Sequence, residues 1–251
     1  MRLNLYLARG GVASRRSSDA LITAGRVTVN GDPVTRLGFT VSDGDRVCLD
    51  GVLVKLARRS RYLALHKPPG FVCTAHDPQG RPRAVELVDG DGGVAGHGGM
   101  AGHGGRLFSV GRLDYRSSGL LLFTDDGQFA EHVAHPSYGV DKDYLVRTAG
   151  GAAIPDDLLD GYRNGLWVDG EHFRLKDYRR RAPDAALLTL GTGRNREIRR
   201  VFADAGIGLG LVVHRIRIGP IRLGALDAGH HRELSEEEVA WFLRLEKRSS
   251  P

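Results

Sequence analysis

The sequence has little cysteine and no long hydrophobic run. Cys48 and Cys73 are the two cysteines among 251 residues, and neither has a second Cys or a His at metal-ligand spacing. A disulfide framework and a zinc site are therefore not indicated. No run of about 18 apolar residues is available to cross a bilayer, and the opening MRLNLYLARGG reaches charge and glycine too early for a secretory signal. We expect a soluble cytoplasmic protein without a resident metal.

Positive charge is in excess. The chain has 36 Lys and Arg against 30 Asp and Glu, a formal net charge of +6, and 41% hydrophobic residues. Its length is sufficient for one or two domains with their own cores. The charge balance favours a polyanionic partner but does not identify it, so the arrangement of the basic residues has to decide.

The first 60 residues predict a small α+β unit with two helices and a hairpin. Ser14 is a suitable N-cap and Gly25 a suitable C′ residue for the second helix, and Asn30-Gly31 is a strong hairpin signal between Val27–Val29 and Val34. Four arginines flank this helix and the following turn: Arg9, Arg15, Arg16 and Arg26. They form a candidate phosphate-binding face, although an ordinary solvated helix surface would carry the same charges.

One stretch of this unit resembles a known module. The segment GVASRRSSDALITAGRVTVNGDPV is similar to the alpha-L RNA-binding module of a small-subunit ribosomal protein, which has a Ser-Arg-Arg helix followed by G-x-V-x-V-N-G. The match extends over roughly the first 50 positions. The resemblance implies that residues 1–60 form an RNA-binding domain and that the four arginines hold an RNA helix.

After a basic connector, KLARRSR, residues 61–251 predict a second α+β domain. Strands dominate residues 62–225 and the helices are short, which favours an antiparallel or mixed sheet with flanking helices. Residues 89–105 are so rich in glycine that we expect a flexible loop, in which His97 and His103 are incidental.

Several local elements of this second domain are predicted in detail. A short helix covers 128–134, and Asp169-Gly170 indicates another hairpin. A helix from Asn195 should bury one stripe of residues: Ile198, Val201, Phe202 and Ala205. The last helix has a capping box of Ser235 and Glu238 and should bury Val239, Phe242 and Leu243.

The stretch GRLDYRSSGLLLFTDDG places Asp114 in a loop directly before an apolar strand. From spacing alone, a cap or a salt-bridge partner explains this carboxylate better than a catalytic role does. Asp125 and Asp126 are explained by turn formation and helix capping. Two adjacent turn carboxylates do not suggest the opposed acids of a hydrolase.

The same stretch closely resembles the active-site motif G-R-L-D-x-x-T-x-G-L-L of pseudouridine synthases that act on ribosomal RNA. Three further segments resemble this family in the same order: HKPPGFVCT, HPSYGVDKDYLVR and GTGRNREIRRVF. Two departures are visible, because Ser117 stands where threonine is usual and Glu197 stands where glutamine is common. The Gly-rich loop is also longer than usual.

The resemblance implies a reaction and a set of residues. Uridine is detached at N1–C1′, turned and rejoined through C5, with no cofactor and no metal. Asp114 is the implied catalytic carboxylate, either as a nucleophile at C1′ or as a base at C2′. Arg199 is its implied cationic partner, and Tyr144 is the implied tyrosine that stacks on the target base. Further basic residues are expected to line RNA phosphates: Lys67, Arg112, Arg194, Arg196 and Arg200.

The expected partner is a folded segment of ribosomal RNA. We expect a monomer that modifies large-subunit (23S) RNA, with small-subunit (16S) RNA as the alternative target. A third possibility is a ribosome-associated protein that binds RNA without catalysis, because the alpha-L module also occurs in non-enzymes. The presence of Asp114, Tyr144 and Arg199 together argues against that third interpretation.

Overall fold

The computed structural model describes residues 1–56, 60–88 and 107–247. The Gly-rich segment 89–105, for which we predict flexibility, lies outside these described residues, as do His97 and His103. The chain separates into two compact units, and residues 1–61 belong to the first while most later residues belong to the second. Within the described ranges, no helix has the length and hydrophobicity that crossing a membrane would need.

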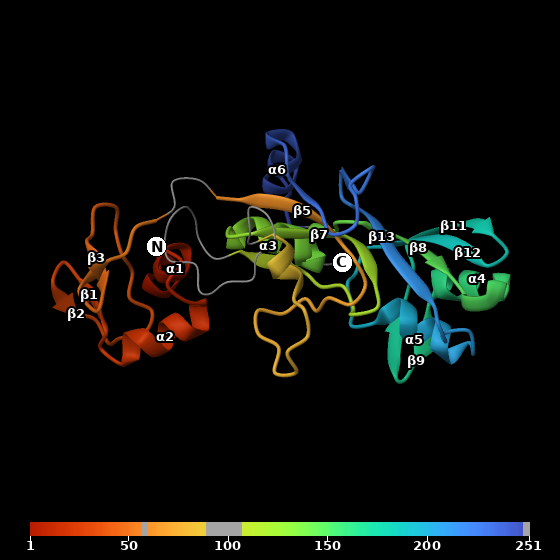
Figure 1. Cartoon of the computed structure of the whole chain (residues 1–251), viewed down its shortest axis with the longest axis horizontal. Coiled ribbons are helices and arrows are strands. Elements are labelled where there is room, and N and C mark those ends of the chain that lie inside the picture. Colours follow the sequence, from red (N-terminus) through yellow and green to blue (C-terminus); the bar gives the residue numbers. More distant parts are fainter. Residues whose placement is uncertain (57–59, 89–106, 248–251) are drawn as a thin grey trace. The chain divides into compact units, whose positions relative to one another are not determined.

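The first unit contains two helices and a small antiparallel sheet (Figure 1). Its helices are α1 (Leu3–Arg9) and α2 (Arg15–Thr23). Its strands follow the order β2-β1-β3-β4 and are β1 (Val27–Val29), β2 (Asp32–Pro33), β3 (Val47–Leu49) and β4 (Val52–Leu53). The Ser14 hydroxyl accepts a hydrogen bond from Ser17 N, which confirms the predicted N-cap.

The predicted hairpin of this unit is also present. Asn30 and Gly31 both have positive φ, at 57° and 97°, as the tight turn between β1 and β2 requires. Val27 and Val29 point their side chains into a core shared with both helices. That core comprises Leu3, Leu7, Ile22, Val27, Val29, Val34, Val41, Val47 and Val54. The helix pair therefore rests on the sheet through aliphatic contacts.

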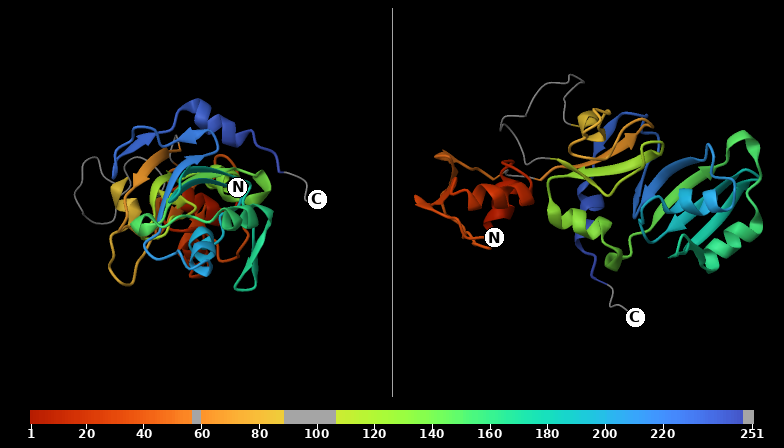
Figure 2. Two further views of the ribbon diagram at one scale, coloured as in Figure 1. Left: turned by 90° about the vertical axis from the view of Figure 1, so that its right-hand side faces the viewer. Right: turned by 90° about the horizontal axis from the view of Figure 1, so that it is seen from below.

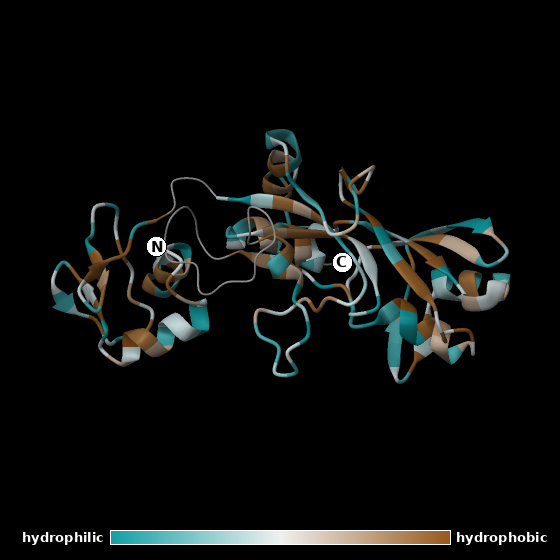
Figure 3. Ribbon diagram, in the orientation of Figure 1, coloured by the Kyte–Doolittle hydropathy of each residue, from teal (hydrophilic) through white to brown (hydrophobic). Residues whose placement is uncertain are grey.

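The second unit is built on a nine-stranded sheet of order β11-β12-β8-β13-β7-β5-β15, with β14 on β13 and β6 on β7. Its strands are β5 (Tyr62–Lys67), β6 (Phe108–Val110), β7 (Ser118–Thr124), β8 (Lys142–Arg147), β11 (Asp177–Ala182), β12 (Ala185–Leu190), β13 (Val212–Ile218), β14 (Ile221–Arg222) and β15 (His231–Glu233). Strand β13 pairs with β7 in parallel and with β8 in antiparallel orientation. The predicted mixed sheet is thus confirmed. Figure 3 shows hydrophobic colouring in its central strands and hydrophilic colouring at its hairpin tips.

Two pairs of helices accompany this sheet (Figures 1 and 2). Helices α3 (Gly127–Ala134) and α6 (Glu236–Leu243) share a core cluster in which Phe129 and Phe242 meet edge to face. Helices α4 (Asp156–Asn164) and α5 (Glu197–Asp204) lie near the hairpin of β9 (Leu166–Val168) and β10 (Glu171–Phe173). Within the described part of the chain there are also three 3₁₀ turns, at Ala84–Leu87, Pro136–Tyr138 and Ala149–Gly151.

The local predictions hold best where a turn or cap specifies the geometry. The hairpin at Asp169-Gly170 and the capping box of Ser235 and Glu238 are both present. Two predicted core residues are wrong, because Ala205 and Leu243 are exposed. Each lies at the end of its helix, after the last buried residue, which is Phe202 in α5 and Phe242 in α6.

Candidate active site

Asp114 lies on a loop whose backbone is held by a buried lysine. Lys67, at the end of β5, is completely buried, and its Nζ donates to the carbonyl oxygens of Pro68 (2.9 Å), Ser117 (2.8 Å) and Asp114 (3.3 Å). Burial lowers the pKa of Lys67 to about 8, while Cys73 and Asp114 act in the opposite direction. The ammonium group therefore fixes both ends of the turn that carries Asp114.

Gly119 explains why the active-site loop ends in Ser-Ser-Gly. It pairs with Arg215 where β7 and β13 run parallel, and its φ is +106°. A Cβ at this position would lie 2.2 Å from the Arg215 carbonyl oxygen. Only glycine permits this approach, which brings the Asp114 loop next to β13.

Asp114 forms an ion pair with Arg199 of α5. The Arg199 Nε lies 3.3 Å from Asp114 Oδ2, and the exposed fractions of the two side chains are 13% and 29%. Arg199 Nη2 donates to the Ser117 hydroxyl at 2.9 Å, and Nη1 donates to the Leu211 carbonyl at 2.9 Å. Ser117 thus supplies the hydroxyl that a threonine would supply. These contacts aim the guanidinium at the carboxylate.

Glu197 positions the start of α5. Its carboxylate is buried and accepts hydrogen bonds from the Tyr162 hydroxyl (3.1 Å) and the Thr192 hydroxyl (2.9 Å). Burial raises the pKa of Glu197, although both hydrogen bonds act against this. Burial and the neighbouring Glu197 raise the pKa of Tyr162. Because Tyr162 belongs to α4, this contact holds α5 in the orientation that presents Arg199.

Tyr144 and Arg215 face each other across the antiparallel pair of β8 and β13. Arg215 Nη1 donates to the Tyr144 hydroxyl at 3.3 Å, and Arg215 Nε donates to the Leu120 carbonyl at 2.7 Å. Arg215 is only 2% exposed, and its guanidinium carbon lies 5.8 Å from the centre of the Tyr144 ring. Its Nη2 is buried and has no hydrogen-bond partner among the described residues.

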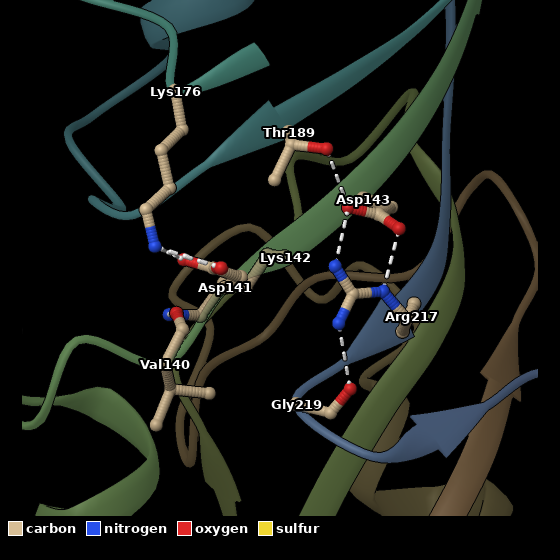
Figure 4. A network of polar contacts seen from close by, with 8 residues as sticks. All are labelled: Val140, Asp141, Lys142, Asp143, Lys176, Thr189, Arg217 and Gly219. Atoms are coloured by element: carbon tan, nitrogen blue, oxygen red, sulfur yellow. Dashed lines mark hydrogen bonds and ion pairs between the residues drawn. The ribbon is translucent and has the colours of Figure 1, made fainter. Parts of the chain in front are cut away.

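A register shift lies between Arg215 and Arg217 on β13, and it gives the two arginines different partners on β8. Arg215 pairs with Tyr144 but Arg217 pairs with Asp143, so the two arginines address adjacent residues of β8, whose side chains point to opposite faces. Arg217 donates to Asp143 at 2.5 and 2.8 Å, and Thr189 also donates to Asp143 at 2.8 Å (Figure 4). Burial would raise the pKa of Asp143, but these hydrogen bonds outweigh it and the net shift is downward.

A pocket of about 140 Å³ opens in front of Asp114, Tyr144 and Arg215. It is far larger than the roughly 10–15 Å³ that one water requires. Six of its lining residues are basic, namely Arg112, Lys142, Arg194, Arg196, Arg199 and Arg215, and two are acidic, namely Asp114 and Glu197. The described residues contain no cluster of His, Cys, Asp and Glu that could hold a metal ion.

Lys142 contributes a half-buried ammonium to this pocket. It lies two positions before Tyr144 on β8, and therefore on the same face of the strand. Its Nζ donates to the Val140 carbonyl at 3.3 Å. Burial and the neighbouring Arg215 lower the pKa of Lys142 to about 8, while Asp141 opposes the shift. Asp141 is itself engaged by Lys176 at 2.7 Å, as Figure 4 shows.

The structure brings Asp114, Tyr144 and Arg199 together in one pocket, with Arg112, Arg194 and Arg196 as exposed lining residues. Two predicted phosphate-lining residues are corrected. Lys67 is completely buried against carbonyl oxygens, so no phosphate can reach it. Arg200 does not line the pocket, because its guanidinium is paired with Glu171 (2.8 Å) and Asp169 (3.3 Å) on the β9–β10 hairpin.

The four arginines predicted to contact RNA in the first unit differ among themselves. Arg15 and Arg16 are exposed in the first turn of α2, and Arg9 is partly exposed at the end of α1. Arg26 is exposed but donates to both carboxylate oxygens of Asp50, at 3.0 and 2.5 Å. Its charge is therefore already compensated within the protein.

Lys142 and Arg215 line the pocket but are not among the site residues predicted from the sequence. Strand β13, which carries Arg215, is not among the predicted elements, yet VVHRIRI is rich in β-branched residues and ends at Gly219-Pro220. An arginine inside such a strand is a signal of a paired or functional cation. For Lys142, the signal is its spacing of two from Tyr144 on a strand.

The chain is similar in sequence to RNA pseudouridine synthases. The family model described as RNA pseudouridylate synthase matches residues 61–204, and the S4 domain model matches residues 1–47. The chain is 39% identical to an uncharacterized RNA pseudouridine synthase of Borreliella burgdorferi over 91% of this chain and 87% of that protein. It is 33% identical to the ribosomal large subunit pseudouridine synthase B of Bacillus subtilis over 95% of this chain and 93% of that protein.

A solved structure is similar as well. The crystal structure of a pseudouridylate synthase superposes with a TM-score of 0.65 at 27% identity and covers 96% of this chain and 99% of its own. The chain belongs to the RNA pseudouridylate synthase family and has an N-terminal S4 domain. The predicted family and α+β fold are thereby confirmed.

Proposed function

We propose that this protein converts uridine to pseudouridine at a defined site in the ribosomal RNA of the large subunit. The observation that carries the proposal is the ion pair of Asp114 and Arg199 in a pocket that also contains Tyr144. The similarity to a large-subunit enzyme over nearly the whole chain supports the choice of substrate.

The proposed role of Asp114 is to act on the sugar. The carboxylate either attacks C1′ while the N1–C1′ bond breaks, or takes the C2′ proton so that the base leaves. Both routes require the ionised acid, the form that pairs with the Arg199 guanidinium. The detached uracil then turns and forms the C5–C1′ bond, while the Asp114–C1′ bond breaks in the first route or the proton returns to C2′ in the second. C5 then loses its proton, and N1 gains one. The atoms of substrate and product balance without a redox partner.

The basic residues of both units support binding of a folded RNA. A uridine in a helix must be turned out of the stack, which costs about a few kcal/mol that other contacts have to offset. Arg112, Arg194 and Arg196 are exposed at the pocket and suit phosphates there. Arg15 and Arg16 occupy the first turn of α2, where the helix dipole disfavours cations, so their placement makes sense for an external polyanion.

Replacement of Asp114 tests the proposed chemistry. Asp114→Asn should lower pseudouridine formation on the order of 10³-fold or more, since the acid loses its charge. RNA affinity should stay within a few-fold, because the phosphate contacts remain. Carbodiimide labelling with primer extension on both ribosomal RNAs, in cells with and without the gene, would locate the target. Normal turnover by Asp114→Asn would refute the role, and a lost pseudouridine in small-subunit RNA would refute the substrate.

Replacement of arginines in α2 tests the role of the S4 domain. The double variant Arg15→Gln and Arg16→Gln should weaken RNA binding and reduce the slope of log K against log salt by about 1–2, since each phosphate contact contributes about 0.7–0.9. Binding isotherms at several salt concentrations measure this slope. Arg26→Gln is the matched control, because Arg26 is already paired with Asp50. An equal slope for wild type and double variant would mean that α2 faces another partner.

A further inference from the structure

The floor of the pocket holds positive charge that the protein leaves uncompensated. Arg215 is 2% exposed and has a buried Nη2 without a hydrogen-bond partner, and no described carboxylate forms an ion pair with it. Lys142 makes one long hydrogen bond, of 3.3 Å to the Val140 carbonyl. Arg215 is buried and the neighbouring Lys142 is half-buried, and neither forms an ion pair with a described carboxylate, so an anion in the pocket would stabilise both charges.

The location of these cations indicates which anion they receive. The exposed arginines Arg112, Arg194 and Arg196 are accessible to the RNA backbone, so phosphates can be bound there. Arg215 and Lys142 lie deeper, directly beside Tyr144 on β8 and β13. A group that reaches them is a nucleobase inserted against Tyr144 rather than a hydrated phosphate. Uracil is neutral in RNA, but it becomes anionic when its bond to the sugar breaks.

We propose that Arg215, assisted by Lys142, binds and stabilises the uracil anion while it is detached from the ribose. The inference rests on the proposed function and adds a catalytic role for two residues. When N1–C1′ breaks, its electron pair leaves with N1 and spreads onto the carbonyl oxygens O2 and O4. Arg215 Nη2 donates to one of these oxygens, and the charge returns to neutral when C5 bonds to C1′, C5 loses its proton and N1 gains one. The role is the same whether Asp114 attacks C1′ or deprotonates C2′.

Preorganised donors are effective for this purpose. Leu120 O and the Tyr144 hydroxyl fix two edges of the Arg215 guanidinium and leave the third free. A donor already oriented in a dry site stabilises a developing charge without reorganisation. The alternative is that Arg215 merely positions Tyr144 through its hydroxyl, and the two roles differ in how the rate depends on the leaving group.

The experiment varies how easily the base leaves as an anion and compares the reaction rates of the variants. Single-turnover reactions would compare a stem-loop RNA carrying uridine at the target with one carrying 5-fluorouridine, whose base leaves more easily as an anion. Nuclease digestion and mass spectrometry measure how fast the intact N1-linked nucleoside disappears. Arg215→Gln removes the charge but retains a donor, and Lys142→Met removes the ammonium. Arg222→Gln, an exposed arginine on β14 outside the pocket, is the matched control.

The expected result is a selective rescue. Arg215→Gln should react about 10²-fold more slowly than wild type with uridine, and Lys142→Met about tenfold. The 5-fluorouridine to uridine rate ratio should rise at least about tenfold in Arg215→Gln and less in Lys142→Met, because a more stable anion needs less help. Arg222→Gln should match wild type. Circular dichroism melts and RNA affinity identify any variant that is misfolded.

Two outcomes overturn the inference, and they differ from failure of the proposed function. If Arg215→Gln slows both substrates equally, Arg215 acts only through structure. If Tyr144→Phe abolishes the effect of Arg215→Gln in the double variant, Arg215 acts through the Tyr144 hydroxyl alone. A wild-type protein that forms no pseudouridine refutes the proposed function itself. Should Arg215→Gln fail to fold, the rate ratio of Lys142→Met decides in the same way.

Discussion

Arg215 and Arg217 are two positions apart on β13 and have opposite surroundings. Arg217 shares two hydrogen bonds with the Asp143 carboxylate, whereas Arg215 has no carboxylate partner among the described residues and lines the pocket. A register shift between them places one on each face of the sheet. Arg217 is therefore paired with a carboxylate on one face, whereas Arg215 faces the pocket on the other without such a partner.

Replacing each arginine in turn gives the largest expected difference between Arg217 and Arg215. Arg217→Met should cost about 3 kcal/mol of folding free energy, because Asp143 is left as a largely buried carboxylate without its cation. Arg215→Gln should change the folding free energy by less than about 1 kcal/mol, because an uncompensated buried charge is removed. Urea unfolding measures both. A larger loss for Arg215→Gln than for Arg217→Met would contradict the assignment of the two faces.

The pH dependence of the reaction rate tests the proposed role of the Lys142 ammonium in the pocket. With a pKa of about 8, this ammonium is charged below pH 8 and loses its proton as the pH rises through that value. Arg215 lowers the pKa and Asp141 raises it, while Asp141 is itself held by Lys176. We expect the single-turnover rate to fall by up to about tenfold between pH 8 and pH 9.

Lys142→Arg supplies the control for this pH dependence. A guanidinium stays charged throughout, so the variant should retain its rate at pH 9 relative to pH 7.5. Rates are measured on the same stem-loop RNA at each pH, with RNA affinity determined in parallel. If wild type and Lys142→Arg decline together, another group controls the alkaline limb.

The smallest expected effect concerns Glu197. Because burial raises its pKa, the folded state holds this proton more tightly than the unfolded state does. The stability that results is complete at acidic pH and is lost as the pH rises through the folded-state pKa. Glu197→Gln keeps the shape of the side chain and cannot ionise, so its stability should fall less between pH 5 and pH 8. Urea unfolding at both pH values compares the slopes, and a steeper loss in Glu197→Gln would contradict the effect of burial.

Much of the local structure follows from short-range rules. Ser14, Asn30-Gly31, Asp169-Gly170 and the capping box at Ser235 each specify a cap or turn, and each is present in the fold. The resemblance of the Asp114 motif to the family also predicts its approach to Arg199, and the two residues form an ion pair. The cap and turn predictions succeed because that geometry depends on neighbouring residues, whereas the approach of Asp114 to Arg199 follows only from the resemblance to the family.

The errors arise where distant segments meet. From the sequence, Lys67 is expected to be an exposed cation after a strand. In the structure its ammonium donates to the carbonyl oxygens of Pro68, Asp114 and Ser117. From the sequence, Arg200 is expected to contact phosphates near the site. In the structure it forms ion pairs with Asp169 and Glu171 of the β9–β10 hairpin. The Asp114 loop that contacts Lys67 and the hairpin that contacts Arg200 both lie far along the chain from these residues, so sequence spacing carries no information about the contacts.

Short-range sequence signals specify the caps, the hairpins and the order of the two units, and the family motif singles out Asp114 among the two acidic residues that line the pocket. The tertiary structure decided which cations are paired and which are free, because that depends on the register of β8 against β13 and on a single irregularity after Arg215. A shift of one residue in a strand exchanges its two faces. The direction in which each arginine points is therefore a property of the assembled sheet.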